Sequence, residues 1–229
     1  MLTVFLLVTG HLFYLTMTLL TEEGPRGAEW PMQALLGDER FWLVFLFIPP
    51  LLTMRLFAEE LGSGTLEMLL TAPLRDWQVV LAKFVAALGF YVVMWLPTLL
   101  YIPILMNLRG TDAQIDPWPV WTSYLGLFGA GAMFLALGLF VSSLVKSQMV
   151  AALVSLVLSL VFVLAAFWRP DMDTAGTTYR LLYFVSVPLH FSRDFTRGLI
   201  DTRHLILYGS VAVFCLFMTV RSLESRRWR

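Results

Sequence analysis

The chain has 229 residues, of which 59% are hydrophobic and 14% charged, and its formal net charge is zero. This composition is too apolar for a soluble domain of that length, and the lack of net positive charge argues against nucleic-acid binding driven by phosphate attraction. The single cysteine, Cys215, excludes a disulfide framework and a cysteine metal site within the chain. We therefore expect an all-α membrane protein that forms a single transmembrane domain over residues 1–229.

Apolar runs without acidic or basic side chains recur along the chain, each close to the roughly 20 residues that a helix needs to cross a bilayer. They predict six transmembrane helices, at about residues 1–20, 40–58, 77–105, 118–142, 148–168 and 203–221. The second span requires the Arg55 side chain to reach water along the helix surface. Strands of a barrel would instead show alternating segments of about ten residues.

Both termini are expected in the cytoplasm. Met1 opens directly into apolar sequence, so we expect no cleaved signal peptide. Six spans place the two ends on one side, and the tail arginines indicate that this side is cytoplasmic: Arg221, Arg226, Arg227 and Arg229. Alternation of the spans then puts eight basic residues on each side, so the orientation depends on the tail.

The second span contains two adjacent prolines at its middle. Pro49 and Pro50 each remove a backbone donor and clash with the carbonyl four residues earlier, so we expect a kink. Two interpretations stay open: a proline tolerated by the membrane bundle, or a bend that shapes a pathway or forms a hinge.

A charged, helix-breaking segment follows, from Met54 to Pro73. Glu59 and Glu60 would each cost roughly 2.5–3.5 kcal/mol at the bilayer centre, so the segment must leave the hydrocarbon. Glu59 is one turn from Arg55 and can form a local ion pair, or both glutamates are merely solvated.

The same segment predicts a short helix at residues 64–70 that lies across the membrane surface. Gly62, Ser63 and Gly64 are expected to end the second helix, and Glu67 suits the first turn of the new one. Pro73 stops it. The apolar side chains available to a partner's groove are then Leu66, Leu69 and Leu70.

Two further stretches carry recognisable patterns. The fourth span has small residues four apart, which predict close helix packing: Gly126 with Ala130, Ala132 with Ala136, and Gly138 with Ser142. Between the fifth and sixth spans, Phe191, Phe195 and Leu199 recur every four residues after Pro188. This predicts outer amphipathic helices at residues 179–198, with a simple interfacial loop as the alternative.

No catalytic or metal-binding pattern accompanies these spans. His11, His190 and His204 are scattered and fit no protease or hydrolase motif, so we expect them to be packing or interfacial residues. The two lysines, Lys83 and Lys146, do not follow the glycine of a phosphate-binding loop. We therefore expect no enzyme activity, no metal and no cofactor in this chain.

The sequence Arg55-Leu-Phe-Ala-Glu-Glu, followed by Gly64-Thr-Leu-Glu-Met-Leu-Leu-Thr-Ala-Pro and Val80-Leu-Ala-Lys-Phe, resembles the permease subunit of type-2 ABC transporters, nearest the gliding-motility-associated branch. Ser142-Ser-Leu-Val-Lys-Ser-Gln and the end of the chain from Val220 are similar to the same branch. The resemblance implies a permease of the bacterial inner membrane that pairs with a second copy or a paralogue. It also implies two ATPase subunits that carry the ATP and magnesium.

In such exporters the loop between spans two and three is a coupling helix docked in the ATPase. The resemblance therefore assigns that role to Glu59, Glu60, Gly64, Thr65, Leu66, Glu67, Leu69, Leu70 and Pro73. It also implies short outer helices between spans five and six, and a cytoplasmic helix before span one that we do not expect here. The alternative is a scaffold that moves no solute, transmits ATP-driven motion, and works with an accessory membrane protein that has a periplasmic domain.

Overall fold

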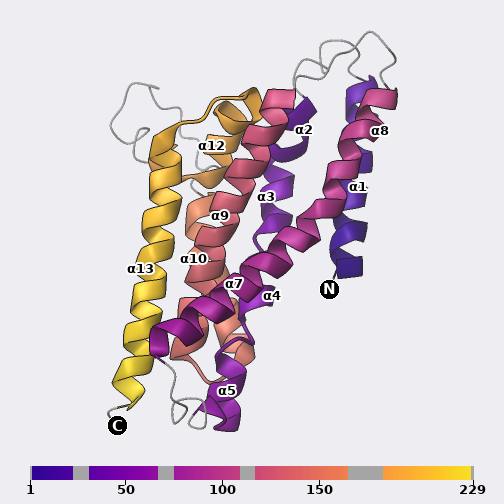
Figure 1. The fold of residues 1–229 in the computed structure, drawn as a ribbon. Coiled ribbons are helices and arrows are strands. Elements are labelled where there is room, and N and C mark those ends of the chain that lie inside the picture. Colours follow the sequence, from indigo (N-terminus) through magenta and orange to yellow (C-terminus); the bar gives the residue numbers. More distant parts are fainter. Residues whose placement is uncertain (1, 23–30, 67–74, 109–116, 165–182, 228–229) are drawn as a thin grey trace.

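The protein is an elongated helical bundle. The computed structural model describes residues 2–22, 31–66, 75–108, 117–164 and 183–227, and these contain helices and turns without a β-strand (Figure 1). The prediction of an all-α fold is therefore confirmed for the described part of the chain. Three helices there are long and apolar enough to cross a membrane, at Asp76–Ile104, Pro117–Leu144 and Thr202–Arg226.

The other three predicted spans coincide with shorter apolar helices, at Leu2–Thr16, Phe41–Thr53 and Gln148–Leu164. Six complete spans therefore remain a prediction. The element α1 covers Leu2–Glu22, and α2 covers Pro31–Leu36.

The predicted second span is divided into several helices. The element α3 covers Glu39–Phe45, and α4 covers Ile48–Thr53, with Pro49 and Pro50 in its first turn. The helix is interrupted at residues 46–47, just before the prolines. The proline rings would clash with the carbonyl groups four residues earlier if the helix continued. Both prolines are buried, as is Leu46 in the interruption, whereas the side chain of Phe47 is exposed.

A long oblique rod crosses the bundle. It consists of α7 at Asp76–Trp95, the 3₁₀ segment η2 at Leu96–Leu100, and α8 at Tyr101–Leu108 (Figure 1). The proline of η2, Pro97, lies in its first turn, where the missing N–H is tolerated. The upper part of the rod lies beside α1: the rings of Phe13 and Tyr101 stack with centroids 4.4 Å apart.

The helix α9, Pro117–Leu144, is the central element and contacts α13, α10, α4 and α7. Its glycines allow close approach: a Cβ on Gly131 would lie 2.4 Å from the Tyr91 ring, and one on Gly138 would lie 2.1 Å from Thr53 Oγ1. The contact at Gly138 confirms the predicted close helix packing for that residue, and Gly131 makes a further close contact that the spacing did not predict. Around it lies an aromatic core in which Trp42, Phe45, Tyr91, Phe134 and Phe191 are almost fully buried.

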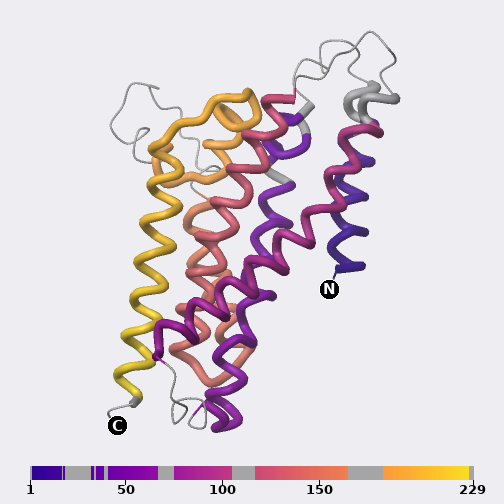
Figure 2. Tube along the Cα trace, in the orientation of Figure 1, coloured from indigo at the N-terminus to yellow at the C-terminus, as the bar shows by residue number. Residues whose placement is uncertain are grey.

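The remaining elements complete the two ends of the bundle. They are α10 at Gln148–Leu164, α12 at Val187–Arg193, the 3₁₀ turn η3 at Phe195–Arg197, and α13 at Thr202–Arg227. The described part of the predicted outer segment, residues 183–198, is thus helical in short pieces; residues 179–182 lie outside the described ranges. Figure 2 shows the chain's C-terminus at the same end as α5, and α2 and α12 at the other. We call these the α5 end and the α12 end.

Candidate functional site

A non-helical segment at residues 54–57 separates α4 from α5, which covers Ala58–Ser63. Glu59 and Glu60 lie in the first turn of α5, where carboxylates interact favourably with the positive end of the helix dipole. The helix ends at Gly64, whose φ of 77° lies in the left-handed region that favours glycine. The helix therefore ends at Gly64, the last of the three residues at which we predicted a break, and Gly62 and Ser63 remain helical.

The predicted coupling helix at residues 64–70 is described only in part. Gly64 and Thr65 form a turn, and Leu66 is helical. Gly64 thus closes α5 instead of opening the next helix. The other predicted contact residues, Glu67, Leu69, Leu70 and Pro73, lie outside the described ranges.

Leu66 is buried within its own chain. Its side chain is 4% exposed and belongs to an apolar cluster with Phe57, Val80, Leu139 and Leu223. The prediction that this leucine is available to a partner's groove is therefore wrong, because α7, α9 and α13 already cover it. The exposed residues of the turn are Gly62, Ser63, Gly64 and Thr65, with Glu59 exposed at the start of α5.

Ser142 of α9 holds the backbone of the non-helical segment at residues 54–57, which we call the α4–α5 interruption. Its Oγ accepts hydrogen bonds from the backbone N–H of Phe57, at 3.1 Å, and of Ala58, at 3.0 Å. The same hydroxyl donates to the carbonyl of Met54 at 3.3 Å. Phe57 is the N-cap of α5 and has no side-chain oxygen, so a serine from another helix satisfies the donors that a capping residue would satisfy.

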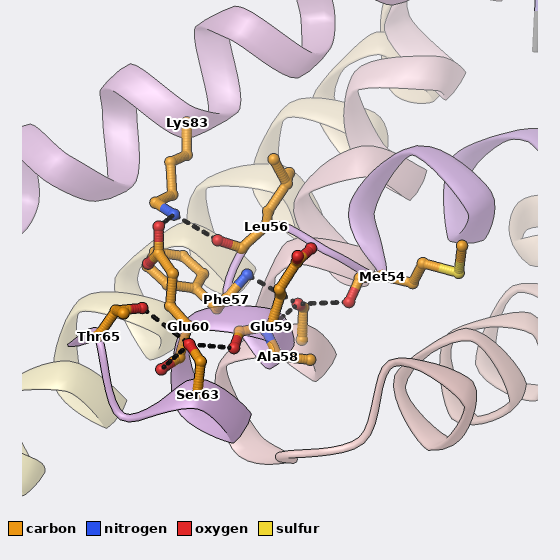
Figure 3. A network of polar contacts seen from close by, with 10 residues as sticks. Met54, Leu56, Phe57, Ala58, Glu59, Glu60, Ser63, Thr65 and Lys83 are labelled. Atoms are coloured by element: carbon orange, nitrogen blue, oxygen red, sulfur yellow. Dashed lines mark hydrogen bonds and ion pairs between the residues drawn. The ribbon is translucent and has the colours of Figure 1, made fainter.

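Lys83 of α7 holds the interruption from the other side. Its Nζ lies 2.5 Å from Glu60 Oε1 and donates to the carbonyl of Leu56. The ammonium also lies 4.6 Å from the centre of the Phe57 ring, within cation–π range. Figure 3 shows the lysine side chain pointing to the glutamate and this carbonyl.

Glu59 and Arg55, both described, do not form the predicted ion pair. Glu60 pairs with Lys83 instead. The side chains of this pair are 31% and 18% exposed, so it is partly shielded from water. Glu60 Oε2 is buried and has no hydrogen-bond partner within the described structure.

Two neighbouring segments complete the α5 end. A Cβ on Gly62 would lie 2.9 Å from the carbonyl oxygen of Lys146, so α5 touches the turn between α9 and α10. The guanidinium of Arg226 donates to the carbonyls of Ser143 and Leu144, at 3.2 and 3.3 Å. A cation there satisfies the unpaired carbonyls at the C-terminus of α9. The described parts of the sequence stretches that carried the resemblance thus meet at one end of the molecule.

The comparison with family models agrees with this arrangement. The model described as ABC-2 family transporter protein matches residues 30–175, which is more than half of the chain. The chain belongs to the ABC-2 transporter family. Members are membrane permease components of ABC transporters and work with a separate ABC ATPase. Comparisons with curated proteins and with solved structures gave no match.

The matched region of this permease includes the whole α4–α5 interruption and the two side chains that hold it, Ser142 and Lys83. Neither was predicted as a site residue. Lys83 could have been found from its charge at the start of a long apolar helix. Ser142 carries no such signal, because serine is common where membrane helices pack closely.

A second polar cluster lies at the α12 end, outside the matched region. The rings of His190 and His204 stack with centroids 3.7 Å apart, so the prediction that the histidines are scattered is wrong for these two. Both are buried, whereas His11 is exposed on α1. The fold of α12 back onto α13 brings them together, which sequence spacing did not reveal.

Each histidine of this cluster has specific partners. His190 Nε2 lies 2.8 Å from the Tyr183 carbonyl, which only accepts, so Nε2 carries the hydrogen and Nδ1 accepts from the Tyr208 hydroxyl. His204 Nε2 lies 2.8 Å from Asp194 Oδ2, which also accepts from the Tyr183 hydroxyl. Burial, and then the neighbouring His204, lower the pKa of His190 to about 4. His190 is therefore neutral near pH 7, and the cluster ties α12 to α13.

Proposed function

We propose that this permease is a six-span subunit of an ATP-driven exporter, and that it works as a pair with a second copy or a paralogue. The three long apolar helices and the three shorter ones at the predicted positions support this number of spans. ATP and magnesium bind to the partner ATPase, whose nucleotide cycle drives the movement of substrate across the membrane.

The proposal assigns ATPase docking to the α5 end. The observation that carries it is that α5 and the turn after it present exposed Glu59, Ser63 and Thr65, while the backbone just before α5 is fixed to α9 and α7. A surface that is exposed and firmly joined to the bundle is suited to receive force from a partner and pass it into the membrane.

The α5 end faces the cytoplasm in this proposal, and the permease lies in the bacterial inner membrane with both termini inside. Support comes from the tail arginines at that end, Arg221 and Arg226, because the positive-inside rule associates basic residues beside a span with the cytoplasm.

A charge reversal tests the docking surface. Glu59→Lys changes an exposed residue of α5 that makes no ion pair within the described structure, and Arg197→Glu makes the opposite change at the α12 end. Each variant is expressed with the partner ABC ATPase and purified from membranes. We expect Glu59→Lys to reduce copurification of the ATPase and Arg197→Glu to leave it unchanged. Equal recovery of the ATPase with both variants would contradict docking at α5.

The second candidate function is a subunit that moves no solute and passes ATP-driven motion to an accessory protein with a periplasmic domain. The observation that favours it is the aromatic core, where Trp42, Phe45 and Phe134 fill the space around α9 in the described structure. A substrate route would then have to lie between permease copies. Cross-links that seal that interface would stop an exporter and leave a purely mechanical subunit active.

A further inference from the structure

The interruption at residues 54–57 is held by side chains from two other helices. Ser142 of α9 bonds to one carbonyl and two N–H groups of the segment from Met54 to Ala58. Lys83 of α7 bonds to the carbonyl of Leu56 between them. Buried backbone groups without partners are strongly disfavoured, so these bonds allow the segment to stay non-helical next to apolar surroundings.

Close packing on both sides of the interruption limits independent movement. Before it, Thr53 of α4 fits against α9 where Gly138 leaves no room for even a Cβ. After it, Gly62 of α5 lies close to the carbonyl of Lys146, where a Cβ would be 2.9 Å from the oxygen. We therefore expect the C-terminal part of α9 to move together with three segments: the last turn of α4, the interruption and α5.

We propose that Ser142 and Lys83 are positioning residues that hold the α4–α5 interruption and transmit movement of α5 to α9 and α7. This rests on the proposed function, in which α5 receives the ATPase. Ser142 is the more important of the two, because its single hydroxyl bonds to the chain before and after the interruption. When α5 moves, the hydrogen bonds of Ser142 displace the C-terminal end of α9. The bonds of Lys83 to Glu60 and Leu56 displace the start of α7.

The neighbouring residue supplies a matched control. Ser143 is also fully buried on α9, but its hydroxyl donates to the Phe140 carbonyl of its own helix. Ser142→Ala and Ser143→Ala therefore remove the same atom from adjacent buried positions, and only the first removes an attachment of the interruption.

The first measurement is hydrogen–deuterium exchange of the full-length permease, followed in peptides that cover residues 54–61. Loss of one helix cap corresponds to a change of roughly 5- to 30-fold in an opening equilibrium. We expect Ser142→Ala to accelerate exchange in these peptides by about that factor and Ser143→Ala to leave it unchanged. Equal behaviour of the two variants overturns the proposal. Should Ser142→Ala fail to fold, Ser142→Cys keeps the volume with a weaker acceptor, and the same peptides are compared.

The second measurement is the stimulation of ATP hydrolysis by the permease, given by the activity of the copurified complex relative to that of the ATPase subunit alone. We expect Ser142→Ala to bind the ATPase normally and to lose most of the stimulation, while Ser143→Ala retains it. Accelerated exchange with full stimulation overturns the role in transmission. An ATPase that binds neither variant nor the unaltered permease contradicts the proposed function instead, and the exchange result still decides whether Ser142 holds the interruption.

Discussion

Removing the Lys83 ammonium should destabilise the α5 end measurably. Lys83→Met keeps most of the apolar stem but eliminates the ion pair with Glu60 and the hydrogen bond to Leu56. It also leaves a carboxylate, 31% exposed, with no cation beside it. Exposed pairs contribute about 0.2–1 kcal/mol, whereas breaking a fully buried pair costs about 3–5 kcal/mol. The partial burial of this pair places the expected loss at about 2 kcal/mol.

The assay is thermal unfolding of the purified permease in detergent. For a protein of this size a loss of 2 kcal/mol lowers the Tm by roughly 4–8 °C. The matched control is Lys146→Met, which changes the other lysine of the chain; that side chain is exposed. Glu60→Gln should cost less than Lys83→Met, because the amide oxygen still accepts from the ammonium. A Lys83→Met shift no larger than that of Lys146→Met would refute the reasoning.

Two further predictions concern the centre of the bundle and the α12 end. Gly138→Ala would place a Cβ 2.1 Å from Thr53 Oγ1 and should lower the free energy of unfolding by about 1–3 kcal/mol. Gly89→Ala, whose Cβ would meet no neighbouring element within 4 Å, should cost less. Equal Tm shifts of the two variants would contradict the close contact at Gly138. For His190, the pKa of about 4 in the folded protein lies below the unfolded value of about 6.5, so its neutral form stabilises the fold fully above pH 6.5. That contribution, about 3 kcal/mol, should be lost as the pH falls from 6.5 through 4, and Tm measured against pH should fall less steeply for His190→Phe than for His11→Gln.

Sequence patterns predicted the apolar helices and the end of a helix at residues 62–64. Both follow from local properties, namely charge, length and glycine content. The end of α5 at Gly64 lies within the predicted break at residues 62–64, while Gly62 itself stays in the helix and packs against the Lys146 carbonyl.

The attachments of the site could not be predicted in the same way. Ser142 is 84 residues from Ala58 in the chain, and its role depends on the position of α9 beside the interruption. Leu66 has the spacing of a docking residue, but packing against Leu139 and Leu223 buries it. His190 and His204 likewise meet only because α12 folds back onto α13.

Site-specific cross-linking in membranes tests docking at the α5 end most directly. A permease with Cys215→Ala carries one new cysteine, at the exposed Thr65 or at Arg197 of the opposite end, and is labelled with a thiol-reactive photo-cross-linker. We predict that Thr65→Cys gives an adduct with the ABC ATPase, identified by mass spectrometry, and that Arg197→Cys gives none. An ATPase adduct from Arg197→Cys without one from Thr65→Cys would contradict the proposed coupling site.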